Sequence, residues 1–225
     1  GSAVQLQFDT IVEQSFHARE RAIDEYVTTH RDAYWNAATR ITPSLKNWTH
    51  VYSRAAFAIL SANAPFDAAV AALWYINRHR GHADPDVMPA YQMVPAKAEW
   101  CNLLPAGDTV LSLTRRYGET FHDHRLRLRR DVQGLGLAKA SFLTALLEPT
   151  TADVACIDTH MQTVYLGTSG FQRLSLKRYL DVEQKVRRVG ARHKVSTFLA
   201  QWMIWDHTRG TVTDHDVFPG GHKSA

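Results

Sequence analysis

The spacing of apolar residues along this chain predicts helices almost throughout. Between Phe8 and His30, apolar side chains recur every three or four positions, which is the spacing of one helix face. Trp48–Ser61 shows the same spacing with more apolar residues, so we expect a buried helix there. Further helices are expected over 67–80, 96–104, 108–117, 122–132, 138–147, 159–167, 176–192 and 195–206. No segment alternates as a strand does, so the pattern predicts an all-α fold.

Composition narrows the class of protein. The 225 residues are 45% hydrophobic and 21% charged, as in an ordinary globular protein with one large domain or two small ones. No apolar run approaches the length of a membrane span, and no signal peptide is visible, so we expect a cytoplasmic protein without a membrane partner. Two cysteines are too few for a four-cysteine cluster. We therefore expect no metal and no cofactor.

The net charge of +4 favours a polyanionic partner only weakly, but two segments concentrate the basic residues. Arg115–Arg130 holds six arginines and two histidines against two acids. Lys177–Lys194 holds seven Lys and Arg residues against two acids. Either run alone is typical of a solvated helix face. Because the two runs flank the glycine-rich turn described next, together they favour nucleic acid.

A glycine-rich turn joins two predicted helices within Val132-Gln-Gly-Leu-Gly-Leu-Ala-Lys-Ala-Ser-Phe142. Gly134 and Gly136 can adopt backbone angles that other residues avoid, and Leu135 between them can enter the core. The amides up to Ala138 would then face outward toward a phosphate. The pattern indicates a helix-hairpin-helix that contacts a nucleic-acid backbone, although a plain tight turn between helices has the same sequence.

Lys139 and Asp158 are the candidate catalytic residues. Lys139 follows the hairpin in the first turn of a helix, and Asp158 comes nineteen residues later within Ile157-Asp158-Thr159-His160. A carboxylate beside the anomeric carbon of a sugar can stabilise the positive charge that develops when an N-glycosidic bond breaks. A lysine amine can attack the same carbon. The alternative roles are a phosphate-binding or exposed lysine and a helix N-cap.

With these residues, the chain resembles the helix-hairpin-helix-GPD superfamily of DNA glycosylases, which includes endonuclease III and the 8-oxoguanine glycosylases. Their hairpin reads Leu-Pro-Gly-Val-Gly-x-Lys, and their aspartate stands in a Val-Asp-x-His context. The stretch Ala58-Ile-Leu-Ser-Ala-Asn63 is similar to Leu-Leu-Ser-Ala-Gln of endonuclease III. The matches span residues 50–167.

The resemblance implies a single two-lobed all-α unit over 3–225 with its active-site cleft between the lobes. The hairpin lobe would cover about 50–167, helices from 3–49 and 168–206 would form the rest, and 208–225 would be a flexible tail. DNA would be the partner, bound by a monomer.

The resemblance also implies site residues beyond the catalytic pair. His160 would contact DNA together with the hairpin, and Asn63 would approach the gap left by a flipped base. Base flipping also requires a stacking pocket. The aromatic residues considered for that pocket are Trp48, Tyr52, Trp205 and Tyr91.

The chain departs from the family pattern in three places. Gln133 replaces the proline, and Ala138 stands where the family lysine falls, so that Lys139 comes one residue later, about 100° around a helix. The iron–sulfur loop of endonuclease III is missing. These departures bear on whether Lys139 acts as a lyase nucleophile.

The resulting hypothesis is a DNA base glycosylase, in a bacterium or a phage-infected cell. A second hypothesis is an enzyme resembling the phage thymine-hypermodification enzymes, which would attach an amino acid or polyamine to activated 5-hydroxymethyluracil in DNA. A third is a DNA-binding module without catalysis.

Overall fold

The computed structural model describes residues 2–89, 92–105, 109–213 and 217–219, and within them it is helical without a β-strand. The predicted all-α class is therefore confirmed for this part of the chain. The elements in chain order are α1 (Ala3–Ile41), α2 (Trp48–Leu60), α3 (Phe66–Arg78), α4 (Val94–Asn102), the 3-10 helix η1 (Thr109–Ser112), α5 (Phe121–Asp131), α6 (Leu137–Leu147), α7 (Thr159–Leu166), α8 (Leu176–His193) and α9 (Thr197–Arg209).

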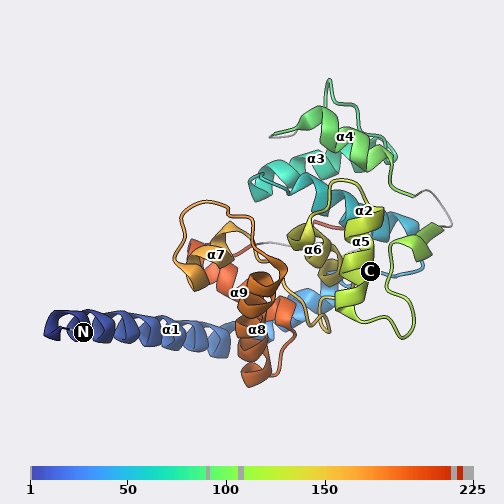
Figure 1. The fold of residues 1–225 in the computed structure, drawn as a ribbon. Coiled ribbons are helices and arrows are strands. Elements are labelled where there is room, and N and C mark those ends of the chain that lie inside the picture. The colour runs from blue at the N-terminus through green and yellow to red at the C-terminus, as the bar shows by residue number, and fades with distance from the viewer. Residues whose placement is uncertain (1, 90–91, 106–108, 214–216, 220–225) are drawn as a thin grey trace.

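The helices pack as two groups (Figure 1). Helix α2 contacts α3, α4 and α6, and α6 contacts α5. Helix α9 contacts α1, α7 and α8. The hairpin lobe therefore consists of α2–α6. Helix α7 packs on α9, whereas the expected hairpin lobe of residues 50–167 would have included it.

Helix α1 is longer than its apolar pattern predicts. It begins after Ser2, whose side chain caps the helix by accepting a hydrogen bond from the Gln5 amide. It runs to Ile41 because no glycine or proline interrupts it, and Tyr34 is among the buried residues that extend its apolar face. Its N-terminal part projects beyond the body (Figure 1).

The helix expected over 108–117 is reduced to η1. Arg127 explains part of this difference. Its guanidinium donates hydrogen bonds to the carbonyl oxygens of Ser112 and Thr114, each at 2.8 Å, and so holds this segment in an open course. Gly118 then turns the chain with a φ of 79°.

The segment expected to be a flexible tail is ordered in its described part. Helix α9 continues to Arg209, and Thr213 then donates a backbone hydrogen bond to the buried Asp206 carboxylate at 3.1 Å. Phe218 is buried against Phe57, with ring centroids 5.1 Å apart. Residues 214–216 and 220–225 lie outside the described residues. None of the described helices is long and apolar enough to cross a membrane.

Candidate active site

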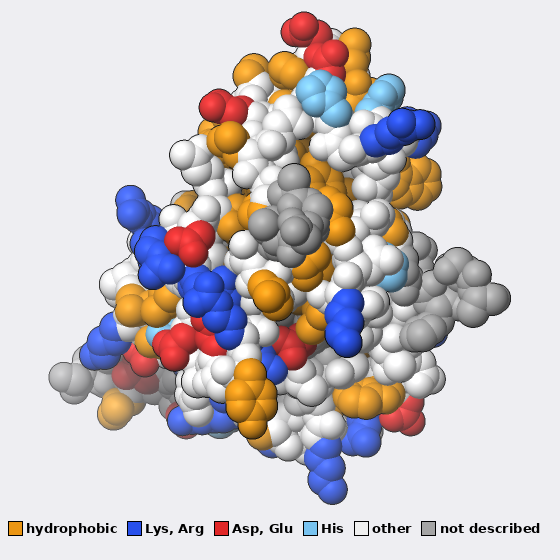
Figure 2. Space-filling model, turned by 90° about the vertical axis from the view of Figure 1, so that its right-hand side faces the viewer, with side chains coloured by type: hydrophobic (Ala, Val, Ile, Leu, Met, Phe, Trp, Pro, Cys, Tyr) orange, Lys and Arg blue, Asp and Glu red, His pale blue; other side chains and the backbone are white. Residues whose placement is uncertain are grey.

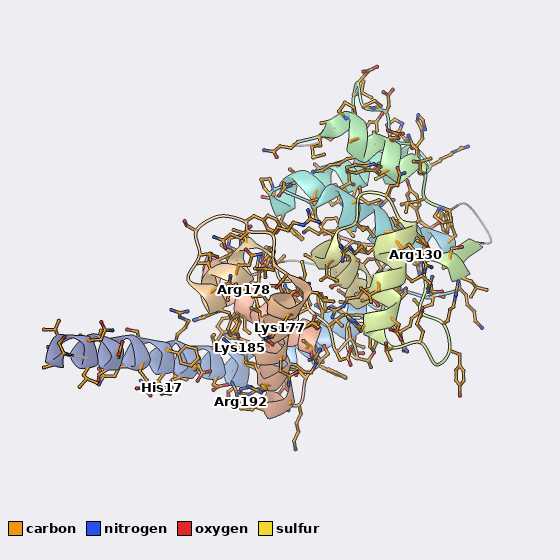
Figure 3. The ribbon with its side chains drawn as sticks, viewed as in Figure 1. His17, Arg130, Lys177, Arg178, Lys185 and Arg192 are labelled. Atoms are coloured by element: carbon orange, nitrogen blue, oxygen red, sulfur yellow. The ribbon has the colours of Figure 1, made fainter. Side chains whose placement is uncertain are left out.

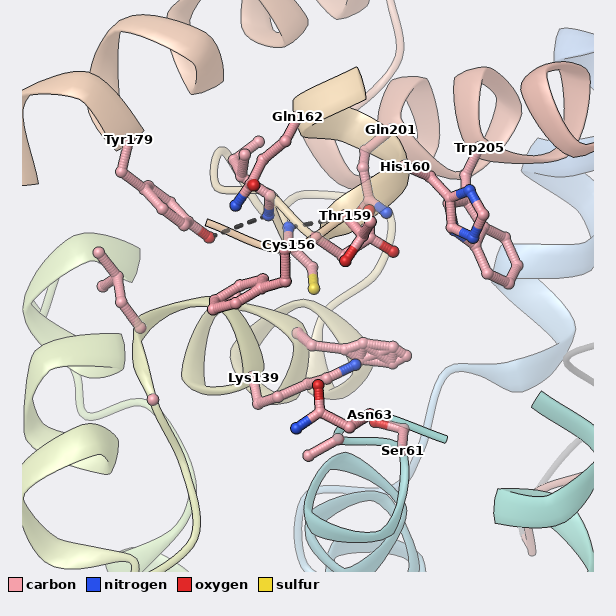
Figure 4. A pocket seen from close by; sticks show the side chains of 18 of the residues that line it. Ser61, Asn63, Lys139, Cys156, Thr159, His160, Gln162, Tyr179, Gln201 and Trp205 are labelled. Atoms are coloured by element: carbon pink, nitrogen blue, oxygen red, sulfur yellow. Dashed lines mark hydrogen bonds between the residues drawn. The ribbon is translucent and has the colours of Figure 1, made fainter. Parts of the chain in front are cut away.

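A cavity of about 820 Å³ lies where the two groups of helices meet. Its walls come from the turn after α2, the start of α6, the segment before α7, the loop before α8, and one side of α9. Figure 4 shows side chains from these elements converging on the opening. Lys139 and Asp158 both line it, and so do Asn63 and Gly136.

Of the two hairpin glycines, Gly134 adopts a backbone conformation that other residues avoid, whereas Gly136 has an ordinary φ of −81°. Gly134 has a φ of 89°, and a Cβ atom built there would lie 2.5 Å from the Trp100 ring. Leu135 is 5% exposed and joins the core. Gly136 is the N-cap of α6, and no side chain caps that helix start. The amides and the dipole at the start of α6 therefore favour an anion beside the cavity.

Lys139 lies in the first turn of α6 and lines the cavity together with Ala138. Its Nζ atom is 5.3 Å from the centroid of the Phe142 ring. In Figure 4 the side chain points toward the turn that carries Ser61 and Asn63. The amine is thus presented to the cavity from the hairpin side.

Asp158 is the N-cap of α7 and also lines the cavity. Its Oδ1 atom accepts a hydrogen bond from the Met161 amide at 3.0 Å. The capping role and the exposure to the cavity therefore coexist in one side chain. The capping bond also fixes the direction of the carboxylate.

The segment before Asp158 is fixed by hydrogen bonds from its backbone amides to buried side chains. Three successive amides each donate to a side chain: Ala155 to Glu183 at 2.9 Å, Cys156 to Gln201 at 3.4 Å, and Ile157 to the Tyr179 hydroxyl at 3.1 Å. Buried amides need such partners, because an unpaired one is costly. The chain is therefore fixed directly before the candidate catalytic carboxylate.

A buried ion pair connects this segment to the hairpin helices. Arg125 of α5 and Glu183 of α8 have side chains that are 1% and 0% exposed. Arg125 Nη2 lies 2.9 Å from Glu183 Oε1, and Nη1 donates to Ser141 of α6 at 3.1 Å. Burial raises the pKa of Tyr179, which also contacts Arg125, so its hydroxyl stays protonated. This network fixes the lysine wall of the cavity relative to the carboxylate wall.

The turn after α2 carries Asn63, which has a φ of 53° and is exposed at the cavity. Asparagine tolerates this left-handed conformation better than most residues. Beneath it, the buried Lys97 donates from Nζ to the carbonyl oxygens of Leu60 at 3.1 Å and Ala62 at 2.7 Å. Burial and then the nearby Lys139 charge lower the pKa of Lys97. Lys97 was not found from the sequence, because nothing in the pattern distinguishes a buried lysine from an exposed one.

The aromatic residues considered for the base pocket divide into two groups. Trp205 lines the cavity, with its ring centroid 5.9 Å from that of His160, which also lines it. Trp48 and Tyr52 do not line it, and their assignment to the pocket is wrong. The Tyr52 hydroxyl donates to the Gly81 carbonyl at 2.8 Å, on a side of α2 away from the cavity. Tyr91 lies outside the described residues.

Several residues that line the cavity were not among those predicted for it from the sequence. The apolar walls include Phe142, Phe198 and Trp202, and Gln201 provides an amide among them. The signal for α9 was the run Gln201-Trp-Met-Ile-Trp-Asp206, in which Gln201 and Trp205 are one helical turn apart. Within the described residues, no group of three or more His, Cys, Asp and Glu side chains is arranged to hold a metal ion.

Comparisons with known proteins extend this picture. The sequence matches no family model, and no curated protein sequence is similar enough to count as a match. Solved structures do match. The Methanocaldococcus jannaschii 8-oxoguanine glycosylase/lyase, in complex with DNA containing 8-oxoguanine, is 20% identical with a TM-score of 0.70, covering 86% of this chain and 98% of that one.

Two further structures agree with the first. Another structure of the Methanocaldococcus jannaschii 8-oxoguanine DNA glycosylase is 19% identical with a TM-score of 0.71, covering 88% of this chain and 97% of that one. The 8-oxoguanine DNA glycosylase of Thermotoga maritima is 20% identical with a TM-score of 0.67, covering 89% and 98%. The chain therefore shares the all-α fold of these 8-oxoguanine DNA glycosylases, in agreement with the fold that the sequence resemblance implies.

Proposed function

We propose that this chain is a DNA glycosylase that flips a modified or mismatched base and cleaves its N-glycosidic bond. The observation that carries the proposal is that Lys139 and Asp158 line one cavity beside a hairpin whose helix start favours a phosphate. A module that only bound DNA would need no carboxylate and amine facing a cavity of this size. The fold shared with DNA glycosylases adds support.

The chemistry follows from the charges. When the N-glycosidic bond breaks, its electron pair leaves with the base, which takes up a proton, and positive charge develops at C1′ of the deoxyribose. The Asp158 carboxylate stabilises that charge. Either water or the Lys139 amine then adds to C1′ and loses a proton. Water gives an abasic site, whereas the amine gives a covalent adduct that opens to a Schiff base.

The walls of the cavity suit a purine or pyrimidine. Pockets for planar ligands are mostly apolar with a few polar groups that fix orientation. Here Phe142, Phe198 and Trp205 supply aromatic surface, and Gln201 supplies an amide that can read a base edge. Because the matched structures are 8-oxoguanine glycosylases, 8-oxoguanine is the first base to test.

The test is to incubate the protein with duplexes that carry 8-oxoguanine, mismatched bases or 5-modified pyrimidines, and to analyse the nucleosides by mass spectrometry. Release of a free base supports the proposal. A mass gain on 5-hydroxymethyluracil that requires an amine donor would support the hypermodification enzyme instead. DNA binding without any chemistry would support the binding module.

Two substitutions separate the roles of Asp158. Asparagine is also a good N-cap, so Asp158→Asn removes the charge and keeps the cap of α7. We expect Asp158→Asn to abolish turnover while DNA affinity and stability stay close to the wild type. Asp158→Ala should lose both turnover and about 1 kcal/mol of stability. Normal turnover in Asp158→Asn would remove the carboxylate from the mechanism.

Borohydride trapping tests Lys139. A Schiff base is reduced to a stable covalent complex, so trapping in the wild type and its loss in Lys139→Gln would assign the nucleophile. Base release without trapping would restrict Lys139 to binding.

A further inference from the structure

We propose that one side of α8 binds the phosphates of the DNA duplex that flanks the flipped base. This inference rests on the proposed function. The surface is called the α8 basic face, and it consists of Lys177, Arg178, Lys185 and Arg188. Figure 3 shows Lys177, Arg178 and Lys185 along α8.

The α8 basic face begins at the cavity. Leu176, the first residue of α8, lines the cavity, and so does Arg173 in the loop before it. Lys177 and Arg178 are exposed directly beyond this edge. Helix α8 lies at the front in Figure 1, and Figure 2 shows Lys and Arg side chains on the left of the face that it draws, with Asp and Glu side chains among them. A strand that enters the cavity would therefore meet these cations on leaving it.

The four cations are not used within the protein. The structure gives their side chains no hydrogen bond and no ion pair, although every residue of α8 is described. Two other arginines of α8 differ in this respect: Arg187 lies 3.1 Å from Glu183, and Arg192 lies 3.0 Å from Asp24. Unpaired like charges on one helix repel one another, and a bound polyanion would relieve that repulsion.

The face also points away from the core. The buried residues of α8 include Tyr179, Val182, Val186 and Val189, which lie on its opposite side. One acid, Asp181, lies among the cations on the exposed side, so the face keeps a net positive charge.

Its length indicates how much DNA it covers. Lys177 and Arg188 are eleven residues apart, which corresponds to about 16 Å along a helix. A duplex rises about 3.4 Å per base pair, so this length matches about 5 base pairs. On the hairpin side, the exposed Arg129 at the end of α5 also lines the cavity. The α8 basic face would thus extend the contact along the duplex on one side of the flipped base.

The experiment uses duplexes with a tetrahydrofuran abasic analogue, so that it does not depend on which base is recognised. In one duplex the analogue has about 3 base pairs on its 5′ side and about 12 on its 3′ side, and the other duplex has these lengths reversed. Affinity is measured from low to high salt for the wild type and for Lys185→Gln/Arg188→Gln. Lys46→Gln, an exposed lysine that does not line the cavity, is the matched control.

Loss of two phosphate contacts should lower the salt slope by about 1.8 and weaken binding roughly 60-fold at 0.1 M salt. We expect this loss with only one of the two duplexes, because the α8 basic face lies on one side. An unchanged slope, an equal loss with both duplexes, or the same loss in Lys46→Gln would overturn the inference and leave the proposed glycosylase standing. Absence of DNA binding by the wild type would overturn both.

Discussion

The buried pair of Arg125 and Glu183 gives the sharpest prediction about what holds the candidate site together. Glu183→Gln keeps the shape of the side chain but leaves the Arg125 guanidinium, which is 1% exposed, without its counter-charge. Breaking a buried pair in this way costs about 3–5 kcal/mol, a large share of the roughly 5–15 kcal/mol that stabilises a typical domain. In a chain of 225 residues each kcal/mol shifts the melting temperature by about 2 °C, so we expect a fall of about 6–10 °C.

Urea unfolding followed by circular dichroism measures this change. The control is Asp131→Asn, which breaks the pair of Arg130 and Asp131, whose side chains are 72% and 47% exposed. An exposed pair contributes little, so the control should unfold as the wild type does. The double substitution Arg125→Met/Glu183→Gln should recover much of the loss, because no buried charge is left uncompensated and the glutamine oxygen can still accept the Ala155 amide.

The same variant, Glu183→Gln, should also have a lower turnover than the wild type. Glu183 accepts the Ala155 amide three residues before Asp158, so a looser segment should lower turnover even at temperatures where the variant is folded. The reasoning is refuted if Glu183→Gln and Asp131→Asn lose equal stability, or if the double substitution is less stable than Glu183→Gln alone.

Three further changes test other parts of the molecule. Gly134→Ala places a Cβ atom against Trp100 at a positive φ and should cost about 1–3 kcal/mol in urea unfolding. Gly136→Ala has nothing within 4 Å of its Cβ and should cost less, about 0.5 kcal/mol, because alanine is a poorer N-cap than glycine; equal effects would contradict the hairpin geometry. Burial lowers the pKa of His124 from 6.5 to about 4, so as the pH falls the unfolded chain takes up the histidine proton before the folded chain does. The contribution of His124 to the free energy of unfolding is therefore complete above pH 6.5 and should fall by about 3 kcal/mol toward pH 4. A His124→Gln variant with the same pH profile as the wild type would refute this. Phe218→Ala should lower the free energy of unfolding by about 3 kcal/mol, because the ring is buried; no change would mean that this residue is not part of the core.

The helices that the sequence predicted best have a clear signal at their start. For α2, an apolar run follows Asn47, whose side chain caps the helix. The prediction failed where tertiary contacts decide the backbone. The segment before Gly118 has helical spacing, but hydrogen bonds from Arg127 hold it open. Phe218 gave no signal in a polar segment, because its burial depends on α2 residues far away in the sequence.

The candidate site was only partly predictable for the same reason. Lys139 and Asp158 could be named because motif spacing links them, and the structure places both on one cavity. The residues that hold their surroundings in place could not be identified. Lys97 and Glu183 are charged residues that a pattern assigns to solvent, and only the folded chain brings each to its buried partners. Trp48 and Tyr52 show the opposite error, since aromatic character alone does not tell which side of a helix faces a cavity.

The position of Lys139 one residue beyond the family lysine has less effect than its displacement around the helix suggests. In the middle of a helix, a shift of one residue turns a side chain by about 100° and can move it to another face. At the start of α6, however, Gly136, Leu137, Ala138 and Lys139 all line the same cavity, because the first turn of the helix borders the opening. The shift therefore does not remove the amine from the cavity, where it points toward the turn of Asn63.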